Sequence, residues 1–422
     1  MIYLILLFGN LKVAKKIYIA ASIGNILEFY DFSLYAFLTP ILAKLFFPES
    51  DSITQLFFAF NIFAMGFIAR PIGAILFGYI GDCYGRKYAL SYSILGTGIA
   101  TALIGLIPIY AEIGILAPII LSILRILQGL CMGGEFSGSL IFASEHLQRY
   151  QARYPAFVTG TIISAGVLGW LSASSISIAV MSENALSWRV LFLIGGLAGF
   201  VGYYLRKTTF DAYPITRTTN NIFKELLALL KYPLIILQVA SIGMLLGTTF
   251  YGHFIFPNSF LPKVTTIDQA SITACTTFGL FVYMIFLPLM GWLSDKWGHL
   301  KMMLIASILL AVLSYSLFHL LTSSSLFNIL CVEILVAVIL STFIAPGAYI
   351  MSTLFPKEIR YLGTSLSYNL GMCLFGGTTP SISLKLFQIT QNVVSPFLYL
   401  LVCAFITTLL ILSVYYQSKK IS

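Results

Sequence analysis

The stretch Gly78-Tyr-Ile-Gly-Asp82-Cys-Tyr-Gly85-Arg86-Lys87 lies in a short loop between two long apolar runs. A similar stretch, Gly291-Trp-Leu-Ser-Asp295-Lys-Trp-Gly298-His299-Leu-Lys301, lies in the second half of the chain. Both follow the pattern Gly-x-x-x-Asp-x-x-Gly with basic residues after it, and both join one apolar run to the next. A repeat on this scale in an apolar chain indicates a transporter made of two similar halves.

The composition is that of a polytopic membrane protein. Of the 422 residues, 59% are hydrophobic and only 9% are charged, whereas soluble domains carry about 25% charged residues. The net charge of +9 lies in short loops, as the positive-inside rule requires, so no nucleic-acid partner is expected. The six cysteines lie mostly in apolar runs without a C-x-x-C pair, which favours packing roles over a disulfide or a metal site.

The apolar runs predict an all-α membrane protein, because about 20 apolar residues form one transmembrane helix. We predict twelve spans, at 17–47, 54–80, 88–110, 114–142, 156–180, 188–205, 232–257, 269–293, 301–321, 326–353, 363–388 and 396–416. If both termini are cytoplasmic, 18 Lys and Arg lie on the cytoplasmic side and 4 on the other. This asymmetry predicts that orientation.

A polar segment near the middle of the chain divides the spans into two sets of six. We predict an N-terminal six-helix half over 1–205, a cytoplasmic linker over 206–231 and a C-terminal six-helix half over 232–422. The linker ends in an amphipathic patch around Phe223–Leu230. The apolar stretch Met1–Phe8 is too short to span and has no positive charge before it, so a cleaved signal peptide is not expected.

Several motifs resemble those of known families. The repeated loop resembles the signature of the major facilitator superfamily. Within that superfamily, the chain resembles the metabolite:proton symporter family. This family includes carriers of proline/betaine, shikimate, citrate and 2-oxoglutarate. The motifs that carry the resemblance are Gly24-Asn25-Ile-Leu-Glu28-Phe-Tyr30-Asp31-Phe32, Arg70-Pro71-Ile-Gly73, Arg125-Ile-Leu-Gln128-Gly129, Gly133-Gly134-Glu135, Trp188-Arg189 and Phe355-Pro356-Lys-Glu-Ile-Arg360-Tyr361. Among the members, the chain looks closest to the proline/betaine transporters.

The resemblance implies two pseudo-symmetric six-helix bundles that rock around a central site and import a solute with protons. It also implies a bacterial inner-membrane location, a monomer, and no partners beyond the solute, protons and the lipid bilayer, with no cofactor. One departure is His299, where the family usually has Arg. We expect this histidine to weaken the inner gate or to make it sensitive to pH.

Ionisable residues inside spans are costly and usually functional. Glu28, Asp31 and Glu135 are candidate proton-coupling residues, since burial favours the neutral form of a carboxyl group unless a cation is near. Arg70 and Arg125 are candidates to bind a substrate carboxylate with a fork of donors. We hypothesise that proton binding to Asp31 or Glu135 releases an arginine for the substrate. The alternative is a permanent ion pair that locks helices together.

Polar and aromatic neighbours extend the candidate substrate site. It comprises Arg70, Arg125, Gln128, Tyr30 and Tyr35. Because aromatic faces bind quaternary ammonium groups, Phe29, Trp170 and Tyr251 are further candidates, although packing is the commoner role in a chain that is 15% aromatic. Glu333 in the tenth span is interpreted as a side chain that reaches the outer surface, with a functional role as the alternative.

The repeated loops predict a gate on the inner side. Its candidate residues are Asp82, Gly85, Arg86, Glu145 and Asp295. In the superfamily that the chain resembles, matching residues hold the two halves together when the carrier is open outwards. We expect Asp82 to interact with the helix N-terminus of the eleventh span, and Asp295 to act in the same way with Lys296.

The sequence also separates classes of function. There is no G-x-x-x-x-G-K-[ST] loop and no nucleophile–His–acid set in a recognisable context, so neither ATP-driven transport nor enzyme activity is expected. A di- or tricarboxylate such as 2-oxoglutarate or citrate would require both buried arginines, whereas a zwitterion such as proline or glycine betaine would require one cation with an aromatic or acidic counterpart. The number of buried acids favours the zwitterion. A non-transporting sensor, a decayed paralogue of the fold and a channel remain alternatives.

Overall fold

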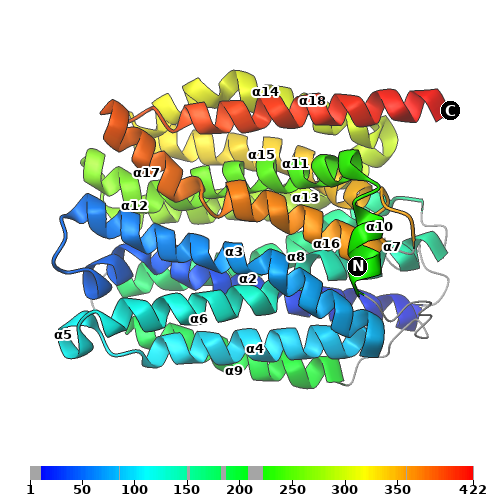
Figure 1. Ribbon diagram of the computed structural model, residues 1–422. Coiled ribbons are helices and arrows are strands. Elements are labelled where there is room, and N and C mark those ends of the chain that lie inside the picture. Colours follow the sequence, from blue (N-terminus) through cyan, green and yellow to red (C-terminus); the bar gives the residue numbers. More distant parts are fainter. Residues whose placement is uncertain are drawn as a thin grey trace.

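The computed structural model describes residues 11–84, 86–149, 153–181, 187–207, 222–357 and 359–421. Within these residues the chain is all-α, and its long helices lie side by side in one bundle (Figure 1). Ten of the described helices are long and apolar enough to cross a membrane. The predicted all-α membrane fold is confirmed. The two predicted spans outside these ten, 188–205 and 363–388, correspond to a shorter helix and to a more polar helical segment in the same bundle.

The first half runs from α2 to α9. Its helices are α2 (Leu11–Phe46), α3 (Ser52–Tyr84), α4 (Arg86–Leu106), the short α5 (Tyr110–Ile113), α6 (Leu116–Met132), α7 (Glu135–Arg149), α8 (Pro155–Met181) and α9 (Trp188–Lys207). Helices α6 and α7 together form the fourth predicted span. The sixth predicted span corresponds to α9, whose apolar residues begin at Trp188.

The second half runs from α11 to α18, after the short α10 (Ile222–Leu229). Its elements are α11 (Pro233–Phe250), η1 (Tyr251–Ile255), α12 (Phe256–Val264), α13 (Gln269–Trp297), α14 (His299–Leu321), α15 (Leu326–Met351), α16 (Arg360–Gly371), η2 (Met372–Gly376), α17 (Thr379–Thr390) and α18 (Phe397–Ile421). The eleventh span begins with α16, whose Ser, Thr, Gly and Asn residues lower its hydropathy.

Three of the twelve spans are interrupted near their middle. The fourth span breaks between α6 and α7 at Gly133-Gly134, where a Cβ on Gly133 would lie 2.2 Å from the carbonyl oxygen of Arg70. Only glycine permits this close approach of α6 to α3. The seventh and eleventh spans contain the π-helical turns η1 and η2, and such turns are frequent at functional sites.

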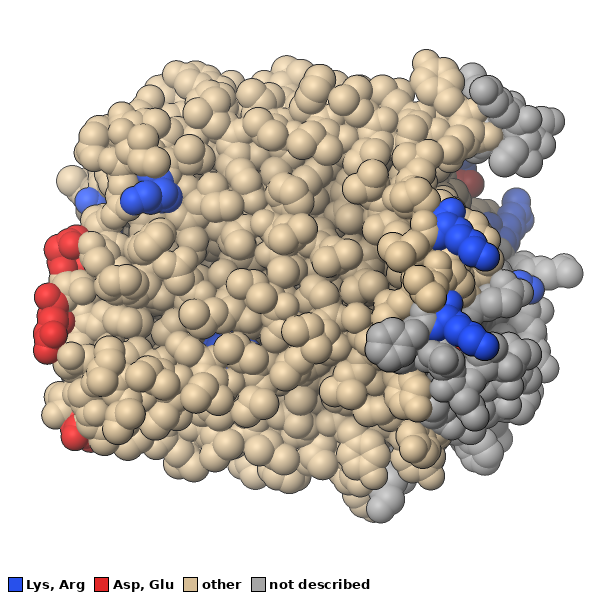
Figure 2. Space-filling model, viewed as in Figure 1, with Lys and Arg blue, Asp and Glu red and all other residues tan. Residues whose placement is uncertain are grey.

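The longest contact between the halves is that of α8 with α13, and α8 also packs on α15 while α3 packs on α16. Along the first contact, the Ser164 hydroxyl donates to the carbonyl oxygen of Met284 at 2.6 Å, and Ser174 hydrogen-bonds with Thr277. The ends of the bundle differ in charge. Most of the visible Lys and Arg lie at the end that holds α10 and the C-terminus, while most of the visible acids lie at the opposite end beside some basic residues (Figure 2). We refer to these as the inner and outer ends, following the predicted orientation.

Candidate functional site

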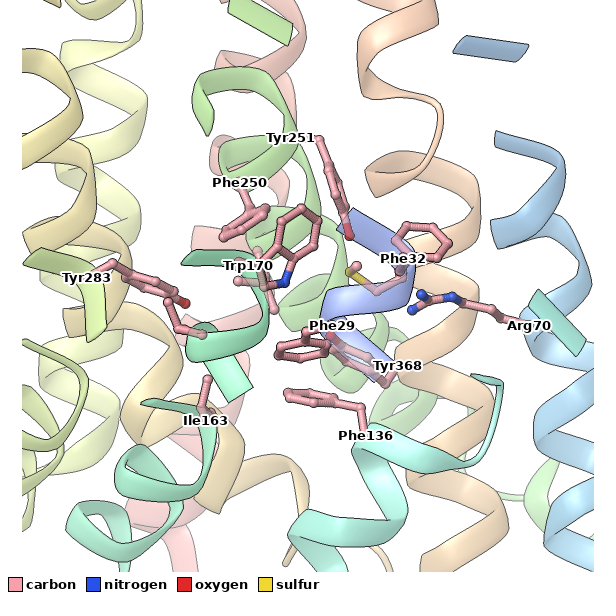
Figure 3. Close-up of a pocket in the computed structure, with 13 residues that line it drawn as sticks. Phe29, Phe32, Arg70, Phe136, Ile163, Trp170, Phe250, Tyr251, Tyr283 and Tyr368 are labelled. Atoms are coloured by element: carbon pink, nitrogen blue, oxygen red, sulfur yellow. The ribbon is translucent and has the colours of Figure 1, made fainter. Parts of the chain in front are cut away.

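A cavity of about 50 Å³ lies between the two halves, near the middle of the bundle. Most of its wall is aromatic (Figure 3). The first half contributes Phe29, Phe32, Arg70, Phe136, Ile163, Val167 and Trp170, and the second half contributes Leu246, Phe250, Tyr251, Tyr283, Tyr368 and Met372. Arg70 is the one charged side chain among these lining residues, and no carboxylate is among them.

Arg70 extends from α3 toward the aromatic residues of the cavity (Figure 3). Its guanidinium carbon lies 4.5 Å from the ring centroids of both Phe32 and Phe67. Its Nη2 atom is 3.8 Å from the sulfur of Met132, and its Nε atom has no hydrogen-bond partner among the described residues. This buried cation therefore retains donors that can bind an anionic group in the cavity.

Arg125 lies behind the cavity wall rather than in it. The side chain is fully buried, and its guanidinium carbon is 4.4 Å from the centroids of Phe32 and Tyr35. It donates to the side-chain oxygen of Gln128. Gln128 in turn donates to Thr101 at 2.9 Å. Within the described part of the chain, Arg125 forms no ion pair, and its Nε and Nη2 atoms have no hydrogen-bond partner.

Asp31 and Tyr30 point away from the cavity, toward α4 and α9. The Asp31 carboxylate is 1% exposed and lies beside Thr101 and Gly195, where a Cβ on Gly195 would be 2.5 Å from its Oδ1 atom. The Tyr30 hydroxyl lies 3.5 Å from the carbonyl oxygen of Leu191 in α9. Asp31, Thr101, Gln128 and Arg125 thus follow one another through α2, α4 and α6.

The other two candidate proton carriers are also buried. Glu28, 3% exposed, lies close enough to Tyr251 and Tyr368 of the cavity wall to act on them electrostatically. Glu135 opens α7 directly after the glycine break, and it accepts a 2.9 Å hydrogen bond from the Ser93 hydroxyl of α4. Glu135 therefore faces α4, while the next residue, Phe136, lines the cavity.

Tyr35 points to the outer part of α3. Its hydroxyl donates to the carbonyl oxygen of Ala59 at 2.9 Å, and its ring covers Arg125. Of the five residues predicted to bind substrate, the structure therefore places Arg70 in the cavity wall. Arg125, Gln128 and Tyr35 form a layer behind it, and Tyr30 packs against α9.

Direct contacts between the halves lie on the inner side of the cavity. The rings of Phe136 and Tyr368 stack with centroids 5.1 Å apart. Below them, the Tyr361 hydroxyl donates to the Gly134 carbonyl at 3.1 Å, and the Asn369 amide donates to the Gly133 carbonyl at 2.6 Å. The glycine break thus exposes two carbonyl groups of the first half, and α16 binds both.

Asp295 forms a second inner contact between the halves. Its two carboxylate oxygens accept the backbone N–H groups of Ala156 and Phe157 at 3.0 and 2.9 Å, at the N-terminus of α8. The Nε2 atom of His299 is 3.7 Å from the same carboxylate. Lys296 instead lies over the Trp292 ring, so the expected cooperation of Asp295 with Lys296 is not seen. The side chains of the remaining gating candidates, Asp82, Gly85, Arg86 and Glu145, lie outside the described residues.

Aromatic contacts close the cavity on the outer side. Tyr251 of η1 packs edge-on against Phe63 and Phe67 of α3, with centroids 5.5 and 5.2 Å apart. Further out, Phe256 of α12 lies 6.3 Å from Phe60 of α3. Contacts between the halves therefore lie on both the inner and the outer side of the cavity.

Comparison with known proteins supports this description of the fold. The model of the Major Facilitator Superfamily matches residues 21–266 and 253–421. A proline/betaine transporter of Escherichia coli is 32% identical over 409 residues, which cover 92% of this chain and 81% of that protein. A proline/betaine transporter of Salmonella typhimurium is 31% identical over 411 residues, which cover 93% and 81% of the two chains.

A solved structure shares the whole fold. The xylose transporter XylE of Escherichia coli, in a partially occluded inward-open conformation, superposes with a TM-score of 0.71 at 17% sequence identity. The match covers 95% of this chain and 97% of that one. At this identity the similarity concerns the fold alone.

Proposed function

Because this chain belongs to the major facilitator superfamily, we propose that it is a proton-coupled symporter in a bacterial inner membrane. It imports a small zwitterion, proline or glycine betaine, by alternating access. The observation that carries this proposal is the aromatic cavity between the halves with a single cation, Arg70, in its wall. The names of the similar proteins support the same solute class.

Arg70 is suited to the carboxylate end of such a solute. A guanidinium presents a rigid fork of donors that matches the two oxygens of a carboxylate. The Phe32 and Phe67 rings hold the guanidinium in place, so little conformational freedom is lost when it binds.

The aromatic rings opposite Arg70 are suited to the ammonium end. Trp170 packs edge-on against Phe250 with centroids 4.7 Å apart, and Phe29 and Tyr251 lie within 6.3 Å of the Trp170 ring. A quaternary or secondary ammonium over such faces gains about 2 kcal/mol once water is excluded. The lining has no carboxylate that would bind a simple cation more strongly.

The position of Arg125 argues against a di- or tricarboxylate. A solute with two or more negative charges would need a second cation in the cavity, because an unpaired buried charge is costly. Arg125 is screened from the cavity by Phe32 and Tyr35. One available cation matches the single carboxylate of a zwitterion.

The volume of the cavity implies that the halves must move. Ligand pockets occupy about 300–1,000 Å³, and the cavity here is about 50 Å³, so it holds water molecules but not the solute. Separation of the inner contacts at Gly133 and Gly134, or of the aromatic contacts at Tyr251, would widen it toward one side at a time.

In this proposal, proton coupling uses the row of side chains behind the cavity. Asp31 lies beside Thr101, whose hydroxyl accepts from Gln128, and Gln128 accepts from Arg125. The Arg125 guanidinium shares the Phe32 ring with Arg70. A change of charge on Asp31 therefore alters the hydrogen bonding of Arg125 and the electrostatic field at Arg70. Glu28 and Glu135 are the other proton carriers in this scheme, from α2 and from the start of α7.

Counterflow in reconstituted vesicles tests the proposal. Labelled proline, glycine betaine and 2-oxoglutarate are offered side by side to vesicles loaded with the unlabelled compound. We expect exchange of proline or betaine and none of 2-oxoglutarate. Exchange of 2-oxoglutarate alone would favour the dicarboxylate carrier, and absence of all exchange would favour a non-transporting sensor or a decayed paralogue.

A further inference from the structure

Glu333 is a fully buried carboxyl group of the second half that plays no part in the site described above. It lies in the outer part of α15, seven residues after Leu326 begins the helix, or about 10 Å along its axis. Its side chain is 0% exposed. The interpretation that it reaches the outer surface is therefore wrong, and its burial needs another explanation.

The carboxyl group connects three helices. The Thr276 hydroxyl of α13 donates to its Oε1 atom at 3.3 Å. The Asn258 amide of α12 donates to Thr276 at 3.2 Å and to the Phe254 carbonyl at 2.7 Å. The Oε2 atom of Glu333 has no hydrogen-bond partner in the part of the chain that the structure describes. It lies against the bare backbone of Gly279, where a Cβ would be only 3.3 Å away.

No cation accompanies this carboxyl group in the described part of the chain. The described residues contain no ion pair to Glu333, and its titratable neighbour on α13 is the thiol of Cys275. His253 of η1, also fully buried, hydrogen-bonds to the Thr249 carbonyl and packs on Phe318 of α14. An ionised carboxylate without a cation costs several kcal/mol when buried, so the neutral acid is the form that suits this closed state.

We propose that Glu333 is a second proton-binding site of the carrier, and that its protonation is coupled to closure of the outer side. This inference rests on the proposed proton-coupled transport. Helix α12, which Asn258 connects to Glu333, also carries Phe256, and Phe256 packs on Phe60 of the first half. In this cycle Glu333 gives up its proton to the inner side after the carrier has opened inward. When the outer side opens again, α12 moves and water reaches the ionised carboxylate, a proton from the outer side restores the neutral acid, and the outer contacts close, so one proton crosses in each cycle.

The variant Glu333→Gln tests the proposal because glutamine has the shape and hydrogen bonding of the neutral acid but binds no proton. Reconstituted vesicles are assayed for solute counterflow and for accumulation driven by a pH gradient. We expect counterflow to persist, while accumulation falls about tenfold at a gradient of about one pH unit, because one coupled proton is lost. Glu112→Gln is the matched control, since Glu112 is an exposed acid of α5, and we expect it to behave as the parent does.

The outcomes separate this inference from the proposed function. If the parent accumulates solute in response to the pH gradient and Glu333→Gln does so equally, the second site is refuted and the proposed function stands. If the parent shows no pH-driven accumulation, the proposed function fails. A sodium ion also binds to oxygen ligands such as those of Glu333, Thr276 and Asn258. If a sodium gradient drives uptake by the parent but not by Glu333→Gln, the site binds sodium and the proposal is overturned.

A direct measurement covers the case in which Glu333→Gln does not fold. Infrared difference spectra of the parent between acidic and alkaline pH, without solute, report carboxyl groups that exchange a proton. Thr276→Val removes the hydroxyl that donates to Oε1 of Glu333, so we expect one carboxyl transition to shift between the parent and this variant. Identical spectra for the parent and Thr276→Val would refute the proposal.

Discussion

Neutralising Asp295 should open the inner side of the carrier. In the closed structure both carboxylate oxygens accept backbone N–H groups at the N-terminus of α8, so one side chain of the second half holds the first half. Asparagine keeps one acceptor and presents an NH₂ group to the other N–H. The loss of one charge-assisted hydrogen bond and of the charge at a helix N-terminus is worth about 2 kcal/mol. The ratio of inner-open to inner-closed molecules should therefore rise about 30-fold.

Labelling of a cysteine in the central cavity measures this shift. Ile163→Cys lines the cavity from α8, and the six native cysteines are first replaced. A membrane-impermeant maleimide is applied from the inner side, and the labelling rate follows the inner-open fraction. We expect Asp295→Asn to accelerate labelling, with the full 30-fold change as the upper limit if the inner-open state is rare in the parent.

Asp268→Asn is a matched control for this experiment. Asp268 also caps a helix N-terminus, accepting the Ser271 backbone N–H at 2.9 Å, but both residues belong to the second half. The Ser271 hydroxyl holds the pKa of the Asp268 carboxyl below its usual range, so this aspartate is ionised at neutral pH. Unchanged labelling in Asp295→Asn, or equal acceleration in Asp268→Asn, would refute the assigned role of Asp295.

Three further predictions concern the cavity and the row of side chains behind it. Arg70→Gln should raise the Kd for betaine about 10- to 100-fold, because a hydrogen-bonded charge contributes about 1.5–3 kcal/mol; an unchanged Kd in equilibrium binding would contradict the assignment of the carboxylate. Trp170→Leu should weaken betaine about 30-fold through the loss of about 2 kcal/mol of cation–π attraction, and equal binding by parent and variant would exclude the aromatic face. Gly195→Ala should displace Asp31, since the new methyl carbon would lie 2.5 Å from Oδ1, lowering stability by about 1–3 kcal/mol and reducing pH-driven uptake. Gly347→Ala is the control, because the atoms nearest to its new methyl carbon are 3.4 Å away. If Gly347→Ala lowers the melting temperature and the uptake as much as Gly195→Ala does, the contact with Asp31 is not the cause.

The helices were predictable because their signal is strong and local. Long apolar runs separated by basic loops indicate membrane spans whatever the packing, and the repeated loop motif indicates two halves. The interruptions were less visible. The turn η1 replaces an α-helical turn within a continuous apolar run, and no residue pattern in the sequence distinguishes a π-helical turn there. At the fourth span, the pair Gly133-Gly134 was a visible signal of the break, but its role in exposing two carbonyl groups depends on the partner helix.

The cavity was predictable only in part, because its wall depends on how each helix is rotated. Phe29, Trp170 and Tyr251 were candidates from their chemistry, and all three line the cavity. Phe136 and Tyr368 were not identified, since aromatic residues are too common in this chain to single out two from different halves. In the sequence, Arg125 and Arg70 were equivalent candidates, since both are arginines inside predicted spans. In the structure, the aromatic rings around Arg125 separate it from the cavity.

The most direct test of the account is uptake by purified carrier in vesicles that hold no internal solute. A pH gradient, acidic on the side of the outer end, is imposed, and labelled glycine betaine is added to that side. The account predicts accumulation above the external concentration that collapses when a protonophore is added. Betaine uptake that only equilibrates, with or without the gradient, would contradict proton coupling.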